Sequence, residues 1–280
     1  MSSVSSKNKK IVIVFGTGSI ACRHSRILSD MGYEVHAATN RSNLVSFDYQ
    51  NGFSEVIYID KIRKLDYCFA VICQISSLHK NTYNFIKNIN KEILIFCEKP
   101  AFYGINPKFI LHNMPYLDLN FNSFKNPINF THKADARLWP SKIPYNQRYM
   151  FIKSMGGGVY TTHSHEIDLF SRYKNYNNNN VEIIREKSIN DLEGNKIIVE
   201  SEFNMNDTNF NFSLLSNKPM RFWEFENKII HFYGDLDNTN KETLFVDSVM
   251  VENSYLNMWL NLTKHDFSKQ NNIKLDIDIN

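Results

Sequence analysis

Six residues near the start of the chain have the types and the spacing of a turn that binds a diphosphate group. Residues 16–21 read GTGSIA and follow an apolar run at 11–15, which matches the pattern G-x-G-x-x-G/A between a buried strand and a helix. The first glycine permits a tight turn, the second lets the backbone approach the pyrophosphate, and the small third residue lets the helix pack on the strand. The helix N-terminus supplies free N–H groups and a partial positive charge. Glycine turns also connect many strands to helices without a ligand, but a full αβ repeat follows this one. It predicts dinucleotide binding by Gly16, Gly18, Ser19 and Ile20.

The end of the second expected strand bears on the ribose of that dinucleotide. An NAD site usually has Asp or Glu there, which accepts hydrogen bonds from the ribose hydroxyls. This chain has Thr39, Asn40, Arg41 and Ser42 instead. Arg41, with Ser42 or Thr39, could hold a 2′-phosphate, which favours NADP over NAD. The alternative is that Arg41 is a solvated loop residue.

The first third of the chain alternates strand-like and helix-like segments. Strands are expected at 11–15, 34–39, 55–59, 67–73 and 93–97, and helices at 19–31 and 77–88. This alternation predicts a parallel, doubly wound sheet with helices on its faces. A last strand of this domain could lie at 116–121.

The pattern changes after Pro100. One conspicuous helix is expected at about 158–173, and the segments 181–185, 197–203, 209–215, 220–226 and 228–233 are typical of an antiparallel sheet with one packed and one wet face. The asparagine run at 177–180 indicates a solvated turn. The expected domains are therefore 1–123, with 1–10 disordered, and 124–280.

Composition excludes several function classes. The 280 residues carry a formal net charge of +3 with scattered basic residues, so nothing points to nucleic acid or an anionic membrane. There is no apolar run of about 18 residues and no secretory signal pattern. The cysteines lack metal-type or redox-type spacing, which favours buried free thiols and a cytoplasmic location; they are Cys22, Cys68, Cys73 and Cys97.

Several short motifs occur in an order that identifies a family. Residues 18–24 (GSIACRH) resemble a G-S-I-G-x-R-H opening, 97–100 (CEKP) contain an E-K-P motif after a buried strand, and 156–168 (GGGVYTTHSHEID) resemble a glycine-led catalytic helix. Residues 76–79 (SSLH) are similar to the segment that precedes the fourth helix in proteins of the same family. Trp139-Pro140, Tyr145 and Arg148-Tyr149 resemble the lead into the catalytic helix. Together these motifs resemble the Gfo/Idh/MocA oxidoreductases, in particular the branch associated with surface-polysaccharide and nucleotide-sugar pathways.

The resemblance implies a Rossmann NAD(P)-binding domain followed by an α+β substrate-binding and oligomerisation domain with an open, mostly antiparallel sheet. The implied chemistry is hydride transfer between nicotinamide and a sugar or nucleotide-sugar carbinol or carbonyl carbon. The implied catalytic residues are Lys99, near the reacting hydroxyl, His165 as general acid/base, and Asp168 one helical turn further on. The implied cofactor contacts are Ser76, His79, Glu98 and Lys99.

The chemistry of the three catalytic candidates fits those roles. Histidine titrates near neutral pH and can take or give the hydroxyl proton. Asp168 shares a helix face with His165 at i,i+3 and could orient its ring or contact substrate. A cation at Lys99, after a strand's carboxyl end, would stabilise a developing alkoxide. The alternatives are a surface lysine and a structural histidine; a metal set of His163, His165 and Asp168 is disfavoured, so no metal is expected.

Four departures from the family pattern leave other functions open. Thr162 replaces an acidic residue, Ile75 replaces a proline, the segment between Pro100 and Trp139 is short, and the chain stops soon after 259–263. The alternatives are a reductase of a non-sugar such as a tetrapyrrole, and a non-catalytic member that binds a ligand or partner. A homo-oligomer could pair through the outer sheet face; the residues that could supply that face, or else the core, are Ile198, Phe210, Phe212, Phe222 and Phe225.

Overall fold

The computed structural model describes residues 10–40, 52–64, 66–99, 109–111, 124–139, 143–174, 180–236 and 240–264. The chain divides into two compact units. The first unit is Met1–Asn113 with Tyr255–Leu262, and the second is Met114–Ser254 with Thr263–Asn280. Some predictions fall outside the described residues: the disordered lead over residues 1–9, the possible strand at 116–121, most of the asparagine run, and the residues Arg41 and Ser42.

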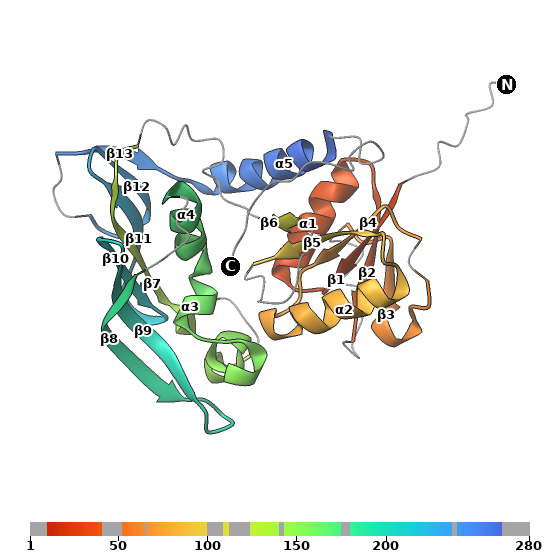
Figure 1. The fold of residues 1–280 in the computed structure, drawn as a ribbon, viewed down its shortest axis with the longest axis horizontal. Helices are drawn as coiled ribbons and strands as arrows, with labels where there is room; N and C mark the ends of the chain where they lie inside the picture. The colour runs from red at the N-terminus through yellow and green to blue at the C-terminus, as the bar shows by residue number, and fades with distance from the viewer. Residues whose placement is uncertain are drawn as a thin grey trace. The chain divides into compact units, whose positions relative to one another are not determined.

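The first unit is built on a six-stranded parallel sheet (Figure 1). Its strand order is β3-β2-β1-β4-β5-β6, so the order reverses between β1 and β4. The strands are β1 (Ile11–Phe15), β2 (Glu34–Thr39), β3 (Glu55–Tyr58), β4 (Phe69–Ile72), β5 (Leu94–Glu98) and β6 (Phe109–Leu111). This is the doubly wound Rossmann arrangement, in which ligands bind beyond the carboxyl ends of the strands at the reversal point. The predicted fold of the first half is confirmed.

Alternation along the central strands decides which helix each residue meets. Residues such as Phe15 and Cys97 belong to a buried cluster that includes Ile86 of α2 (His79–Ile89). Their neighbours in sequence point to the opposite face, because side chains alternate along a strand. Glu98 is on that opposite face, where it meets His24 of α1 (Ser19–Asp30).

The last described helix, α5 (Ser248–Lys264), also belongs partly to the first unit. Trp259 is fully buried there. Its ring stacks on Phe69 at 5.7 Å between centroids and meets Phe96 edge-on at 5.3 Å. The sequence pattern predicts no helix at 248–258, so this packing is visible only in the structure.

The second unit contains a seven-stranded, mostly antiparallel sheet of order β13-β12-β11-β7-β10-β9-β8. Its strands are β7 (Pro127–Asp135), β8 (Val181–Asn190), β9 (Lys196–Met205), β10 (Thr208–Ser213), β11 (Leu215–Phe225), β12 (Lys228–Tyr233) and β13 (Glu242–Phe245). The helices α3 (Val159–Thr162) and α4 (Ser164–Lys174) lie on one face of this sheet (Figure 1). The open, mostly antiparallel second sheet is confirmed.

Aromatic side chains fill the space between that sheet and its helices. Phe130, Phe203 and Phe210 stack in a row at 5.2 and 4.8 Å between centroids. Of the five residues proposed for an outer pairing face, Phe210, Phe212 and Phe225 are buried in this core. Ile198 and Phe222 are partly exposed.

The prediction of a single helix at 158–173 is wrong in detail. The structure has two helices, α3 and α4, with His163 between them. The backbone of His163 leaves the helical region, with φ −102 and ψ 25. Its Nε2 lies 3.1 Å from the carbonyl oxygen of Ser213. This contact to β10 fixes the residue at the break.

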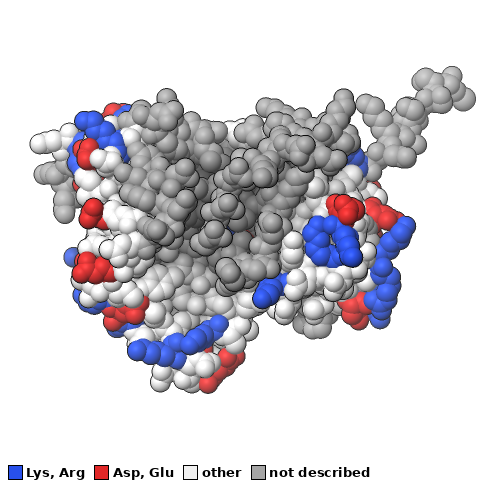
Figure 2. Space-filling view, viewed as in Figure 1, with Lys and Arg blue, Asp and Glu red and all other residues white. Residues whose placement is uncertain are grey.

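None of the described helices has both the length and the apolar character needed to cross a bilayer. On the described part of the face in Figure 2, acidic and basic side chains are interspersed.

Candidate active site

The glycine turn after β1 has the geometry that a diphosphate site needs. Gly16 has φ +121, and a Cβ there would lie 2.9 Å from the carbonyl oxygen of Cys73. Its N–H donates to the carbonyl oxygen of Ala38 at 2.8 Å. Only glycine combines this φ with so close an approach, because a side chain would meet backbone. The turn therefore passes closely over the ends of β2 and β4.

The helix that follows presents its N-terminus without a side-chain cap. Gly18 is the N-cap of α1, no described side chain bonds to it, and a Cβ at Gly18 would meet no atom within 4 Å. The first intrahelical bond runs from Cys22 N to Gly18 O at 3.0 Å. The N–H groups of the first turn, which include those of Ser19 and Ile20, have no intrahelical partners and can bind an anion. Ala21 is fully buried, as close helix packing requires.

The residues at the end of β4 lie beside this turn in the sheet. Ser76 is buried in a short 3₁₀ turn, Ser76–Leu78, that precedes α2. His79 is also buried, with Nε2 2.9 Å from the carbonyl oxygen of Gln74 and Nδ1 3.6 Å from the Cys97 thiol. In this structure the His79 ring therefore supports the loop after β4. Its contact with a cofactor stays a prediction.

Glu98 and Lys99 stand at the end of β5. Glu98 is 5 % exposed, and its Oε1 accepts a 2.7 Å hydrogen bond from Nε2 of His24. Its Oε2 accepts a 3.3 Å bond from the backbone N–H of Lys99. Burial by itself raises the pKa of Glu98, but the His24 hydrogen bond, together with the charge and the backbone N–H of Lys99, outweighs it and holds that pKa below its usual value. Glu98 is thus a buried carboxylate directly before the candidate lysine.

The topology brings the first-unit candidates to one edge of the sheet. β1, β4 and β5 are neighbours and parallel, so the Gly16 turn, the Ser76 segment and Lys99 all follow carboxyl ends at the same edge. That edge includes the point where the strand order reverses. It is the ligand-binding position of open α/β sheets.

The candidates of the second unit lie on α4 and on the glycine segment before α3. His165 is half-buried in the first turn of α4, and Asp168 is three residues further along the same helix, so they share a helix face. Gly156 and Gly158 have φ values of +77 and +119, and a Cβ on Gly157 would lie 2.4 Å from the carbonyl oxygen of Tyr149. The glycine run is therefore a tight, specified turn.

Thr162 is the position where related proteins were expected to carry an acidic residue. Its hydroxyl donates to the carbonyl oxygen of Gly158 at 2.9 Å. It thus bonds back to its own helix.

Next to His165 the structure has a buried charge cluster that sequence reasoning missed. Glu166 has no exposed surface, and its Oε1 accepts hydrogen bonds from Arg221 Nε at 2.7 Å and Trp223 Nε1 at 3.4 Å. Nδ1 of His132 lies 3.1 Å from the same oxygen. Burial raises the pKa of Glu166, but the charges of Arg221 and His132 hold it well below its usual value. No local signal pointed to this cluster, because its members lie on β7, α4 and β11.

His163 packs against this cluster and is neutral. Its ring centroid lies 3.8 Å from that of His132, and the side chain has no exposed surface. Burial and the neighbouring His132 lower the pKa of His163 well below its usual value. Among the described residues no group of His, Cys, Asp or Glu is arranged to hold a metal ion.

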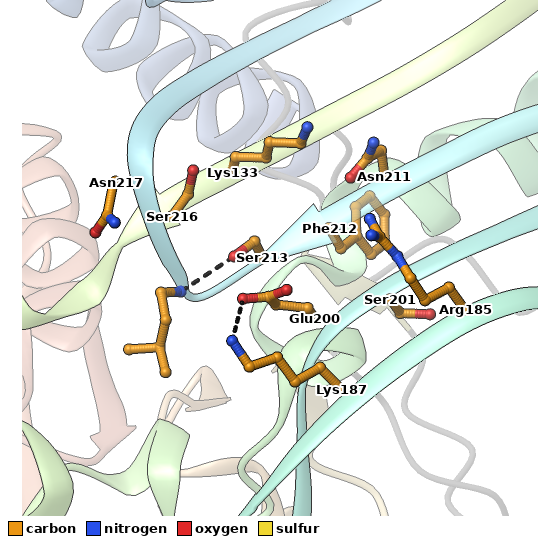
Figure 3. A pocket seen from close by; sticks show the side chains of 11 residues that line it. Lys133, Arg185, Lys187, Glu200, Ser201, Asn211, Phe212, Ser213, Ser216 and Asn217 are labelled. Atoms are coloured by element: carbon orange, nitrogen blue, oxygen red, sulfur yellow. Dashed lines mark hydrogen bonds and ion pairs between the residues drawn. The ribbon is translucent and has the colours of Figure 1, made fainter.

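The described cavities of the second unit lie apart from the predicted site residues. One of about 300 Å³ is lined by residues of strands β7 to β11 (Figure 3). Lys133, Arg185 and Lys187 line it, and Lys187 pairs with Glu200 at 3.3 Å. A smaller cavity of about 190 Å³ borders Gly157, Gly158 and Tyr160.

Comparison with known proteins finds relatives at the level of structure. No protein-family model matches the sequence, and no curated protein matches it. The solved structure of UDP-N-acetylglucosamine 3-dehydrogenase GnnA from Acidithiobacillus ferrooxidans matches with a TM-score of 0.55 at 12% identity, over 91% of this chain and 90% of that one. A protein from Magnetospirillum magnetotacticum MS-1 described as an oxidoreductase matches with a TM-score of 0.56 at 8% identity, over 90% and 91% of the two chains.

A third structure agrees with these two. It is yvaA from Bacillus subtilis, also described as an oxidoreductase, with a TM-score of 0.51 at 12% identity over 79% of this chain and 69% of that one. At such identities the likeness concerns the fold. The resemblance inferred from the motifs therefore holds at that level: the chain has the two-domain fold of these oxidoreductases, a parallel Rossmann-like sheet followed by a mostly antiparallel one.

Proposed function

We propose that this chain is an NAD(P)-dependent oxidoreductase of the Gfo/Idh/MocA family that transfers hydride between nicotinamide and a carbinol or carbonyl carbon of a sugar or nucleotide sugar. The observation that carries the proposal is the shared carboxyl-end edge of the sheet. The uncapped α1 N-terminus follows β1 there, and Lys99 follows β5, the parallel strand on the other side of β4. The motif resemblance and the likeness to a nucleotide-sugar dehydrogenase support the substrate class.

The turn after β1 fits a dinucleotide. Gly16 and Gly18 leave the backbone bare where phosphate oxygens would approach, and Ser19 and Ile20 add N–H groups of the first helical turn. Bound there, the dinucleotide supplies the nicotinamide that accepts or gives hydride. Arg41 and Ser42 are the candidates for a 2′-phosphate, so NADP is the favoured form in this proposal.

Three side chains carry the remaining chemistry. The Lys99 ammonium stabilises negative charge on the reacting oxygen. His165 takes the hydroxyl proton in oxidation and returns it in reduction. Asp168 orients the imidazole or contacts the substrate. A cytoplasmic location and a homo-oligomer belong to the same proposal, and the free thiols at all four cysteines support the first.

Two measurements test the proposal together. Thermal unfolding with saturating NADH or NADPH should show stabilisation by at least one of them. With a panel of sugars and nucleotide sugars, Lys99→Ala and His165→Ala should each reduce turnover by about 10²-fold or more and leave dinucleotide affinity nearly unchanged. Lys80→Ala, at an exposed lysine of α2, is the matched control and should keep full turnover. Unchanged turnover in both site variants would refute the assignment.

One observation favours a second candidate, a non-catalytic member that binds dinucleotide and scaffolds a partner. The Thr162 hydroxyl is engaged with Gly158, so the carboxylate typical of the family is replaced by an internal helix bond. This candidate predicts stabilisation by dinucleotide with no turnover across the panel. A reductase acting on a tetrapyrrole would instead turn over only with that substrate.

A further inference from the structure

A chain of buried hydrogen bonds connects the C-terminal helix α5 to the residue before Lys99. Nε1 of Trp259 donates to Nδ1 of His24 at 2.9 Å, and Nε2 of His24 bonds to Oε1 of Glu98 at 2.7 Å. Trp259 and His24 have no exposed surface. All three residues belong to the first unit.

The chemistry of the donors fixes the direction of this chain. An indole N–H can only donate, so Nδ1 of His24 must be the acceptor. The proton of the neutral ring is then on Nε2, which donates to the Glu98 carboxylate. Trp259 thereby selects the tautomer of His24 that Glu98 needs.

Both carboxylate oxygens of Glu98 have hydrogen-bond partners. Oε1 is held by His24, and Oε2 accepts the backbone N–H of Lys99 at 3.3 Å. A buried carboxylate stays ionised when such bonds and a nearby cation outweigh the cost of desolvation. The family resemblance implies that Glu98 contacts the cofactor, but the hydrogen bonds of the structure turn its carboxylate toward α1 and toward the backbone of Lys99.

We propose that His24 and Trp259 are positioning residues that act through Glu98 on Lys99, which makes α5 a working part of the active site. This inference rests on the proposed function, since it concerns the lysine assigned to the reacting oxygen. The ionised Glu98 keeps Lys99 protonated and fixes the backbone from which it projects. Loss of the indole N–H frees His24 to take the other tautomer, which removes the donor from Glu98.

The other ionisable groups near Glu98 do not supply the negative charge that acts on Lys99. The thiols of Cys73, after β4, and Cys97, on β5, are close enough for the Glu98 charge to act on them. Burial and that charge raise the pKa of both thiols, that of Cys97 to about 12. They are therefore neutral at physiological pH. On α5, the Tyr255 ring packs against His24 at 5.5 Å and accepts a 3.2 Å bond from Arg23 at its hydroxyl.

The test measures Lys99 directly and does not depend on turnover. The titration midpoint of Lys99 is followed by NMR of its 13Cε in the full chain carrying labelled lysine, with the signal assigned by its loss in Lys99→Met. Glu98→Gln should lower the midpoint by about one pH unit, because a neighbouring negative charge is removed. Trp259→Phe, which keeps a ring against Phe69 and Phe96, should lower it in the same direction. His24→Gln should do so as well.

Phe69→Leu is the control for packing. It weakens the stacking of Trp259 and leaves every hydrogen bond of the chain in place, so it should reduce stability and leave the Lys99 midpoint unchanged. In wild type the imidazole 15N shifts should report His24 protonated at Nε2, and Trp259→Phe should change that pattern. An unchanged Lys99 midpoint in both Glu98→Gln and Trp259→Phe overturns the inference.

Parallel turnover assays separate this inference from the proposed function. If wild type reduces a sugar ketone, Trp259→Phe should move the basic limb of its kcat/KM profile to lower pH, while Phe69→Leu should not. If wild type turns over and the kcat/KM profiles of wild type and Trp259→Phe coincide, the positioning role is contradicted and the proposed function is not. Absence of turnover, with the Lys99 midpoint shifted as described, contradicts the proposed function alone.

Discussion

Arg221 and Glu166 form a buried ion pair in the second unit, with Arg221 Nε 2.7 Å from Glu166 Oε1 and no exposed surface on Glu166. The pair joins β11 to the first turn of α4. Because Glu166 follows His165 directly, the contact also fixes the part of α4 that carries the candidate acid/base. An acidic residue in the first turn further complements the helix dipole.

Breaking this pair from one side should be costly. Arg221→Met leaves the Glu166 charge buried without its main partner, and we expect a loss of about 3–5 kcal/mol of unfolding free energy. Urea unfolding of the full chain, followed by circular dichroism, measures it. The double variant Arg221→Met with Glu166→Leu removes both charges and should recover most of the loss. A single variant as stable as wild type would show that the pair is not formed.

The free energy of unfolding should decrease as the pH falls, in two steps. His163 has a lowered pKa in the folded chain, so below about pH 6.5 the unfolded chain binds a proton that the folded chain does not. Glu166 and Glu98 also have lowered pKa values, so the stability they contribute is present above about pH 4.5 and is lost as the pH falls toward their folded-state values. Both steps favour unfolding in acid.

The first step can be assigned to one residue. His163→Gln can keep a donor toward the Ser213 carbonyl and has no titrating ring, so its stability should change less than that of wild type between pH 7 and pH 5. His231→Gln, at a half-buried histidine that bonds to Gly234, is the matched control and should follow wild type. Urea midpoints across this pH range provide the measurement, and identical slopes in wild type and His163→Gln would contradict the assignment.

The two glycines of the phosphate-binding turn should respond differently to alanine. Gly18→Ala meets no atom within 4 Å at an ordinary φ of −77, so the free chain should keep its stability within about 0.5 kcal/mol. The added methyl would lie where phosphate approaches, so dinucleotide affinity should fall at least tenfold. Gly16→Ala combines φ +121 with a 2.9 Å contact and should lose both stability and binding. Thermal unfolding with and without NADPH distinguishes the two effects, and full NADPH stabilisation of Gly18→Ala would remove the turn from the proposed site.

The sequence predicted the parts of the fold whose signals are local. The run Ile11–Phe15 is buried from Val12 onward, and the turn after it needs Gly16 for its φ. The strand before Lys99 could also be predicted, because its apolar run is continuous. These elements are specified by residues adjacent in the chain, so one segment of sequence is enough to identify them.

Features that depend on distant partners were not predictable. β7 reads PINFTHKAD, and its polar residues Thr131, His132 and Asp135 are buried. His132 lies beside Glu166 and His163, which come from a distant part of the chain. At the break between α3 and α4, His163 contacts Ser213, 50 residues away along the chain. Likewise, Trp259 bonds to His24 across 235 residues. In each case the contact, and so the role, exists only after folding.

The expectation of four buried thiols is wrong for Cys68, which is exposed, while Cys22, Cys73 and Cys97 are buried. The thiolate is the reactive form, and burial raises the pKa of Cys73 and Cys97. Brief treatment of the native chain with iodoacetamide should therefore label Cys68 alone, as read by mass spectrometry.

The matched variant of that experiment also tests the end of β5. Cys68→Ser should leave no rapidly labelled site in the native chain, and unfolding in urea should expose the remaining three. Cys97 directly precedes Glu98, and its thiol lies 3.6 Å from His79 on the α2 face of the sheet. Its slow labelling then reports how often the strand end that carries Lys99 opens. Rapid native labelling of Cys97 would mean that this strand end is not closed, and that Lys99 is not held as the structure requires.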